Sequence, residues 1–150
     1  MNEPINFYHL NKPYGFFSNF APYPIALKEK LWPTSEHYFQ AQKFVNTSHE
    51  EEIRQAKTAG EAAEFGRDRG RPLRRDWEAV KNDVMREALY AKFTQHPDLT
   101  EQLLSTGNAT LIEHTKNDRY WGDAGDGTGL NMLGQLLMEI REQIRVNPVN

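Results

Sequence analysis

The chain has 150 residues, no cysteine and a formal net charge of −3. A chain of this length buries roughly 68–70% of the surface that its unfolded form exposes, so one core can form without disulfide bonds. The absence of cysteine excludes thiolate zinc sites, iron–sulfur clusters and cysteine nucleophiles. The acidic balance argues against a dedicated nucleic-acid-binding protein.

Short extended segments and turns are expected in the first third of the chain. Residues 5–10 alternate in the manner of a strand, and residues 24–27 and 31–32 are typical of a short hairpin around residues 28–30. A helix is expected directly after Pro33, with Thr34 or Ser35 as its N-cap.

Helices are expected over most of the remaining sequence. Ser48 and Thr58 each precede a glutamate by three residues, the capping-box spacing, which predicts two short successive helices. A longer helix is expected from near Asp76, because apolar residues recur there every three or four positions: Trp77, Val80, Val84, Ala88 and Ala91.

The last third is predicted to hold two helices and one strand. Pro97 suits the first turn of a helix that carries Leu99, Leu103 and Leu104, and residues 109–115 suit a strand. The last helix has a narrow apolar face formed by Leu133, Leu136, Leu137, Ile140 and Ile144. Without repeats or linkers, we predict one mainly helical α+β domain with a small β-sheet over residues 1–150.

The helix after Pro33 has a polar face. Glu36, Gln40 and Lys43 project within about 60° of one another at helical spacing. A carboxylate, an amide and an ammonium on one face can hold a polar ligand, although a solvated face with an ordinary Glu–Lys contact has the same pattern. Glu36 lies in the first turn, where the helix dipole favours its ionised form, and Trp32 and Pro33 precede it closely.

An arginine-rich run follows at residues 66–75. It holds five arginines in nine residues, with glycines that allow close backbone approach. The planar arginine side chain matches phosphate oxygens bidentately, which indicates a phosphate site. A solvated charge run that pairs with neighbouring acids is an equal alternative.

A glycine-rich loop is predicted at residues 117–131. Asp123 lies among its glycines, and Trp121 stands two residues earlier. Such a loop exposes a carboxylate beside a ring that could stack a planar base, whereas the alternative is a set of ordinary Asp-Gly turns with a core tryptophan. The loop fits neither the calcium-binding pattern nor GxGxxG.

Two further patterns carry less information. Residues 14–20 are dense in aromatics around Ser18 and Asn19, which indicates either a core plug or an aromatic wall with polar contacts. The five histidines are dispersed without an HxxxH or HExxH spacing, so no metal site is expected.

These segments, in this order, resemble the NADAR family, and within it the N-glycosidases that act on intermediates of riboflavin synthesis. The block WPTSEHYFQAQKF at residues 32–44 is highly specific, and we see no departure from the pattern. The resemblance covers nearly the whole chain through residues 17–20, 32–44, 66–69, 73–77, 113–115, 120–123 and 129–134.

The resemblance implies hydrolysis of the ribosyl C1′–N bond of phosphoribosylamino-pyrimidines, with release of ribose 5-phosphate and an aminopyrimidine. Glu36 would stabilise the oxocarbenium-like sugar or activate water, with Asp123 as its complement. The remaining site residues would bind the substrate. Lys43, Arg67 and Arg69 would hold phosphate, Trp32 and Trp121 would stack on the base, and Asn19 would contact the sugar or the base edge.

Two alternatives are considered. Other members of the family imply a hydrolase that removes ADP-ribose from guanine in nucleic acid, and an alternative from another class of protein is a noncatalytic module that binds ADP-ribose or NAD. We expect a small-molecule substrate, no cofactor and no metal, with nucleic acid as a partner only under the first alternative. We also expect a cytoplasmic protein, because no apolar run approaches the ~18 residues of a membrane span and the first residues lack signal-peptide features.

Overall fold

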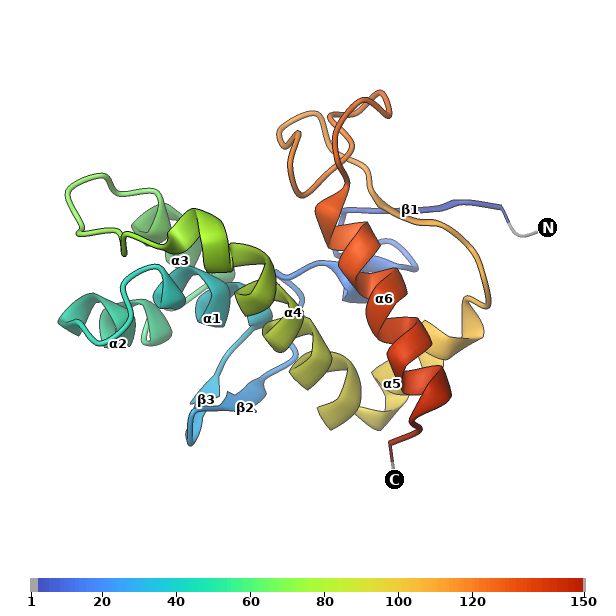
Figure 1. Ribbon diagram of the computed structural model, residues 1–150, viewed down its shortest axis with the longest axis horizontal. Helices are drawn as coiled ribbons and strands as arrows, with labels where there is room; N and C mark the ends of the chain where they lie inside the picture. Colours follow the sequence, from blue (N-terminus) through green and yellow to red (C-terminus); the bar gives the residue numbers. More distant parts are fainter. Residues whose placement is uncertain (1–2, 150) are drawn as a thin grey trace. The chain divides into compact units, whose positions relative to one another are not determined.

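The computed structural model describes residues 3–149 and is mainly helical, with four short strands in that range (Figure 1). The predicted α+β class is confirmed. The chain divides into unit 1, residues 1–21 and 93–150, and unit 2, residues 22–92. In chain order, the elements are β1 (Ile5–Phe7), the 3₁₀ helix η1 (Gly15–Phe17), β2 (Ile25–Leu27), β3 (Lys30–Trp32), α1 (Ser35–Gln42), α2 (Ser48–Arg54), α3 (Ala59–Gly66), α4 (Trp77–Gln95), α5 (Pro97–Ser105), β4 (Leu111–Glu113) and α6 (Met132–Val146).

Unit 1 contains a two-stranded parallel sheet of β1 and β4, against which α6 packs. Both strands are shorter than the predicted 5–10 and 109–115. The last bond of the pair runs from the His114 N–H to the Phe7 carbonyl. Beyond it the chain turns after His9 on one side and enters the loop 114–131 on the other, so no further pairing is possible.

Two residues at the start of α6 fix this helix against β4. A side chain at Gly134 would overlap with the Leu111 carbonyl, so only glycine allows the helix to approach the strand this closely. Asn131 is in the left-handed region at φ +51°. Its side-chain amide donates to the Leu111 carbonyl and accepts from the Glu113 N–H at 2.9 Å each, and this pairing closes the loop 114–131 at its C-terminal end.

The aromatic segment of residues 14–20 acts chiefly as a core plug. Phe17 is fully buried, and its ring contacts the rings of Phe7, Tyr14, Phe16 and Phe93. Stacked and tilted contacts of this kind add to the apolar burial of the rings. The segment thus joins β1 to the end of α4 within unit 1.

Unit 2 begins with the predicted hairpin. β2 and β3 pair antiparallel with Leu27 opposite Lys30, which leaves a two-residue turn. Lys28 and Glu29 in this turn have φ values of +56° and +61°, the twist that a tight hairpin needs and that asparagine and glycine adopt more easily. Two non-glycine residues at positive φ require support from elsewhere in the unit.

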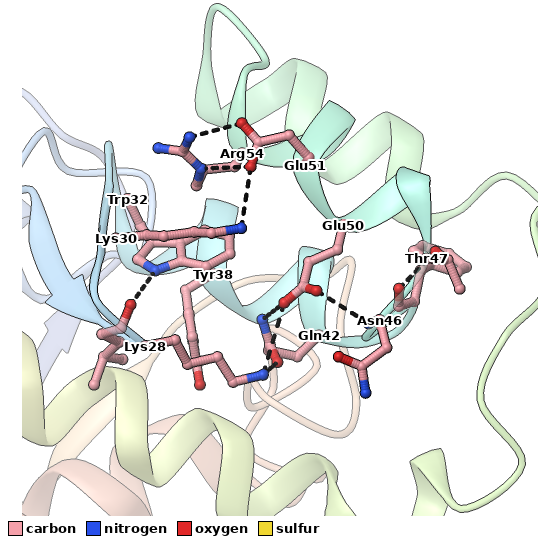
Figure 2. A network of polar contacts seen from close by, with 12 residues as sticks. Lys28, Lys30, Trp32, Tyr38, Gln42, Asn46, Thr47, Glu50, Glu51 and Arg54 are labelled. Carbon is pink, nitrogen blue, oxygen red and sulfur yellow. Dashed lines mark hydrogen bonds and ion pairs between the residues drawn. The ribbon is translucent and has the colours of Figure 1, made fainter.

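Polar side chains supply this support by connecting the hairpin to α1 and α2 (Figure 2). Lys28 donates to the Gln42 side chain and lies 3.7 Å from the Glu50 carboxylate. Gln42 also donates to Glu50 at 2.8 Å. Farther along, Arg54 pairs with Glu51 and donates to the Leu31 carbonyl. The hairpin is thereby fixed at its turn and along its second strand.

The short helices of unit 2 begin at side-chain caps. The Thr34 hydroxyl accepts the His37 N–H and caps α1, and the Thr58 hydroxyl accepts the Glu61 N–H and caps α3, as predicted. The cap predicted at Ser48 is wrong by one residue, because the Thr47 hydroxyl accepts the His49 N–H and caps α2. Glu50, three residues after the actual cap Thr47, accepts the backbone N–H of Asn46. The capping residues therefore lie one position earlier than predicted.

The long helix α4 has a wider buried face than the sequence indicated. Trp77, Ala88 and Ala91 of the predicted stripe are buried, and Val80 and Val84 are half-buried. A second stripe of Met85, Leu89 and Phe93 is also buried. Between the two stripes, the side chain of Lys92 is fully buried, with its ammonium 5.8 Å from the centroid of the Tyr23 ring.

We predict that Lys92 makes the free energy of unfolding depend on pH. Burial lowers the pKa of Lys92 from 10.5 to about 7, so between these values the unfolded chain binds more protons than the folded one. Stability therefore rises with pH through this window. Lys92→Met, which keeps the side-chain volume, should be more stable than the wild type near pH 7. The difference should shrink by about 1 kcal/mol per pH unit toward pH 10 in urea titrations. A constant difference would contradict the prediction.

Candidate functional site

The polar face of α1 is buried. Glu36 and Gln40 are only 8% and 7% exposed, which excludes the alternative of a solvated face. The Gln40 amide donates to the Glu36 carboxylate at 2.7 Å, as the i, i+4 spacing allows. A carboxylate removed from water needs compensating partners, and Gln40 is the partner that fixes its orientation.

Lys43, directly after α1, places a cation next to this carboxylate. Its ammonium donates to the Gly66 carbonyl at 3.2 Å and lies about 6 Å from the ring centroids of Phe39 and Trp77. Burial lowers the pKa of Lys43; the Glu36 carboxylate raises it in part, whereas Arg67 lowers it further. Lys43 is therefore within electrostatic range of both Glu36 and Arg67, and the predicted grouping of these side chains is present in unit 2.

Gly66 at the end of α3 makes this arrangement possible. A Cβ at this position would overlap with Oε1 of Gln40 and lie 2.6 Å from its Cδ. The absence of a side chain lets α3 pack close to α1 and brings Arg67, the next residue, beside Lys43. Sequence reasoning included Gly66 in the arginine run but did not detect its contact with Gln40.

The five arginines of residues 67–75 fall into two groups. Arg71 pairs with Glu52 and Asp68, and Arg74 pairs with Asp76 and donates to the Gln42 carbonyl. These two fix the loop to the rest of unit 2. The other three are exposed, and within residues 3–149 no ion pair or hydrogen bond involves their side chains: Arg67, Arg69 and Arg75.

Trp32 does not offer a surface for a base. Its ring is 0% exposed, its Nε1 donates to the Leu27 carbonyl at 3.0 Å, and Tyr38 contacts it edge-on. The Arg54 guanidinium lies 6.0 Å from the ring centroid. Figure 2 shows this tryptophan enclosed by the hairpin and α1. We therefore correct the interpretation of Trp32 as a stacking residue: it belongs to the core.

In unit 1, Asp123 is buried in the loop 114–131 and organises it. One carboxylate oxygen accepts the backbone N–H groups of Thr115 and Gly125 at 3.2 and 2.8 Å. The other lies 2.9 Å from Nδ1 of His114. Burial alone would raise the pKa of Asp123, but these hydrogen bonds and the nearby His114 hold it below the ordinary value.

The glycines of this loop serve its tight folding. A side chain at Gly129 would lie 2.5 Å from the Gly122 carbonyl, and Gly125 has φ +82°. Asp118 and Asp126 accept backbone N–H groups within the loop, which is the turn-forming role considered as an alternative. Asp123 differs from them because its second oxygen is directed to a histidine rather than to the backbone.

The other two predicted residues of unit 1 have different exposures. Trp121 is half-buried, and the Tyr120 ring contacts it edge-on at 4.9 Å. Asn19 is buried directly after η1. The sequence analysis included His114 in the segment 113–115 of the family resemblance but assigned it no role in the site. Its pairing with Asp123 was not predicted. Within residues 3–149, no group of three metal-binding side chains is present and no helix is long and apolar enough to cross a membrane.

We predict that Gly66→Ala displaces the Gln40 side chain and weakens its hydrogen bond to Glu36. The overlap should cost about 1–3 kcal/mol of unfolding free energy, the usual cost of overpacking. Gly60→Ala in the same helix is the matched control, because a Cβ there meets only the Thr58 hydroxyl, at 3.8 Å. It should be neutral or stabilising by up to ~1 kcal/mol. Equal effects of the two changes in urea unfolding would contradict the role of Gly66.

Comparison with known proteins relates the whole chain to one group. Over 142 residues it is 58% identical to N-glycosidase YbiA of Escherichia coli, a match that covers 95% of this chain and 89% of that protein. The NMR structure of E. coli YbiA matches with a TM-score of 0.90 and 56% sequence identity, over 97% of this chain and 88% of that one.

Two more distant relatives differ in length. An N-glycosidase of Nostoc punctiforme is 47% identical over 144 residues, which cover 94% of this chain and 92% of that protein. A riboflavin biosynthesis protein of Vibrio vulnificus is 41% identical over 145 residues, which cover 97% of this chain but 40% of that protein. The NADAR domain matches residues 6–145. With a family match that includes most of both units and relatives of this identity, the chain belongs to the NADAR domain family.

Proposed function

We propose that this N-glycosidase hydrolyses the ribosyl C1′–N bond of phosphoribosylamino-pyrimidine intermediates of riboflavin synthesis and releases ribose 5-phosphate and an aminopyrimidine. The enzyme class rests on close relatives named N-glycosidases. The substrate is supported by a relative named for riboflavin biosynthesis. The structural observation that carries the proposal is the buried Glu36 carboxylate, oriented by Gln40 and within electrostatic range of Lys43, which is itself within range of Arg67.

Cleavage of a ribosyl C–N bond develops positive charge on the sugar ring. A fixed carboxylate stabilises such charge most when it is shielded from water, because the effective dielectric constant is then low. Glu36 meets this condition, since it is 8% exposed and hydrogen-bonded to Gln40. In the proposed reaction Glu36 stabilises the oxocarbenium-like sugar or accepts a proton from the attacking water.

A phosphate group on the ribose gives the cations of unit 2 a role. Arg67 and Arg69 are exposed and make no ion pair within residues 3–149, whereas the neighbouring Arg71 is paired with acids. Arginine binds phosphate oxygens bidentately. We assign Arg67 and Arg69 to the phosphate, together with Lys43, whose ammonium is held at the Gly66 carbonyl.

Three residues of unit 1 complete the assignment. Asp123 is the second carboxylate of the reaction, Trp121 stacks on the pyrimidine, and Asn19 contacts the sugar or the base edge. Half-burial of Trp121 leaves part of its ring accessible. Stacking of this type contributes about 1–3 kcal/mol per base in single-stranded nucleic-acid sites.

One set of assays separates this proposal from its alternatives. Release of ribose 5-phosphate from the phosphoribosylamino-pyrimidine is compared with release of ADP-ribose from ADP-ribosylated guanine in DNA. Preference for the second substrate would replace the proposed one. Binding of ADP-ribose in a titration, without turnover of either substrate, would instead indicate a noncatalytic module.

We predict that Glu36→Gln lowers kcat by at least ~10², the usual scale for an acid–base or charge-stabilising group. The amide keeps the size of the side chain but loses its charge, so the unfolding transition should change little. The matched control is Glu64→Gln, an exposed glutamate on α3. Near-normal turnover of the Glu36 variant would remove this residue from the mechanism.

We predict that Arg67→Ala raises KM for the phosphorylated substrate about tenfold, the lower end of the range for one charged hydrogen-bonding partner. The same change should leave KM for the dephosphorylated nucleoside nearly unchanged. Arg86→Ala on α4 is the control, because Arg86 pairs with Asp83 outside the arginine run. If Arg67→Ala weakens both substrates equally, the phosphate assignment fails.

A further inference from the structure

His114 and Asp123 form an oriented acid–base pair at the end of β4. Nδ1 of His114 lies 2.9 Å from one oxygen of Asp123, while the other oxygen accepts the Thr115 and Gly125 N–H groups. The His114 N–H donates to the Phe7 carbonyl, so the backbone at this position is fixed by the β1–β4 pair. The carboxylate and the imidazole are therefore both held in place.

The two members of the pair differ in exposure. The Asp123 side chain is 10% exposed and that of His114 is 49% exposed. Both carboxylate oxygens of Asp123 are engaged, one by the Thr115 and Gly125 N–H groups and the other by His114. Within residues 3–149, Nε2 of His114 has no hydrogen-bond partner. Of the two side chains, the imidazole is thus the one that can reach a bound molecule.

We propose that His114 donates the proton to the leaving nitrogen of the base, with Asp123 as its positioning residue. This inference rests on the proposed function. The C1′–N bond breaks with its electron pair on nitrogen, and that nitrogen takes the proton from Nε2 of His114. The water oxygen bonds to C1′, the proton that water loses passes to solvent, and His114 takes a proton back from solvent. Asp123 stabilises the imidazolium and fixes its tautomer.

The charged surroundings of His114 are simple. Asp123 is the titratable side chain that pairs with it within residues 3–149. On the paired strand, Tyr8 and His9 follow Phe7; along its own segment, the nearest charged residues are Glu113 before it and Lys116 after it. The helix α6, which packs against β4, carries Glu139, Arg141 and Glu142. A pH profile that changes when His114 is replaced can be compared with the profile of a His9 variant, since His9 is exposed in the same unit and its ring contacts the Tyr8 ring edge-on.

The test uses His114→Ala, His114→Gln and His9→Ala on the substrate that the wild type turns over. His114→Ala should lower kcat by at least ~10², and added imidazole should restore about tenfold by taking the place of the missing side chain. His114→Gln should show the same loss without rescue, because glutamine fills the space and carries no transferable proton. If His114 is the acid, the wild-type kcat should fall as rising pH removes the proton from the imidazolium, and both variants should lack this fall. His9→Ala should keep the wild-type rate and profile.

The outcomes separate this inference from the proposed function. Turnover by His114→Ala within threefold of the wild type overturns the inference, as does a loss that imidazole does not rescue and that leaves the pH profile unchanged. The proposed function stands in both cases. Absence of wild-type turnover on both the pyrimidine and the ADP-ribosylated guanine overturns both. If His114→Ala unfolds, His114→Gln decides by its pH profile.

Discussion

The burial of one carboxylate, Glu36, sets the requirements for unit 2. An ionised group removed from water is stable only beside donors and cations, and the chain supplies Gln40 one turn later and Lys43 after the helix. Gly66 lets α3 approach closely enough to place its carbonyl at Lys43. The caps of α1 and α3 and the polar network around the hairpin hold these helices in place. The packing of α1 against α3 in this unit thus meets the requirements of a buried charge. A core of apolar residues alone would not need these polar partners.

The two carboxylates singled out by sequence are held in opposite ways. Glu36 is oriented by a side-chain amide and has Lys43 within electrostatic range, whereas Asp123 is bound by two backbone N–H groups and a histidine. A carboxylate with a lowered pKa and three hydrogen bonds is a poor proton donor at neutral pH. In the proposed reaction, its neighbour His114 donates the proton instead. The two carboxylates therefore have different functions there: Glu36 stabilises charge and Asp123 positions the histidine.

Arginine clusters illustrate how a structure divides residues of one type. Sequence places five arginines in one run and cannot distinguish them. In the fold, Arg71 forms ion pairs with Glu52 and Asp68, and Arg74 forms one with Asp76. These pairs fix the loop. Arg67 and Arg69 are exposed, and no ion pair within residues 3–149 involves them. Trp32 shows the converse: its place beside the polar helix suggested a ligand contact, yet the hairpin and Arg54 enclose it.

Local patterns determined which segments became helices and strands, since capping residues, Pro33, Pro97 and apolar periodicity act within a few residues of one another. They also placed Glu36, Gln40 and Lys43 on one face, because that spacing is a property of a single helix. They could not determine whether that face was solvated, which arginines were paired, or that His114 meets Asp123 across a loop. These depend on contacts between residues distant in sequence, such as Gln40 on Gly66, and only the tertiary structure decides them.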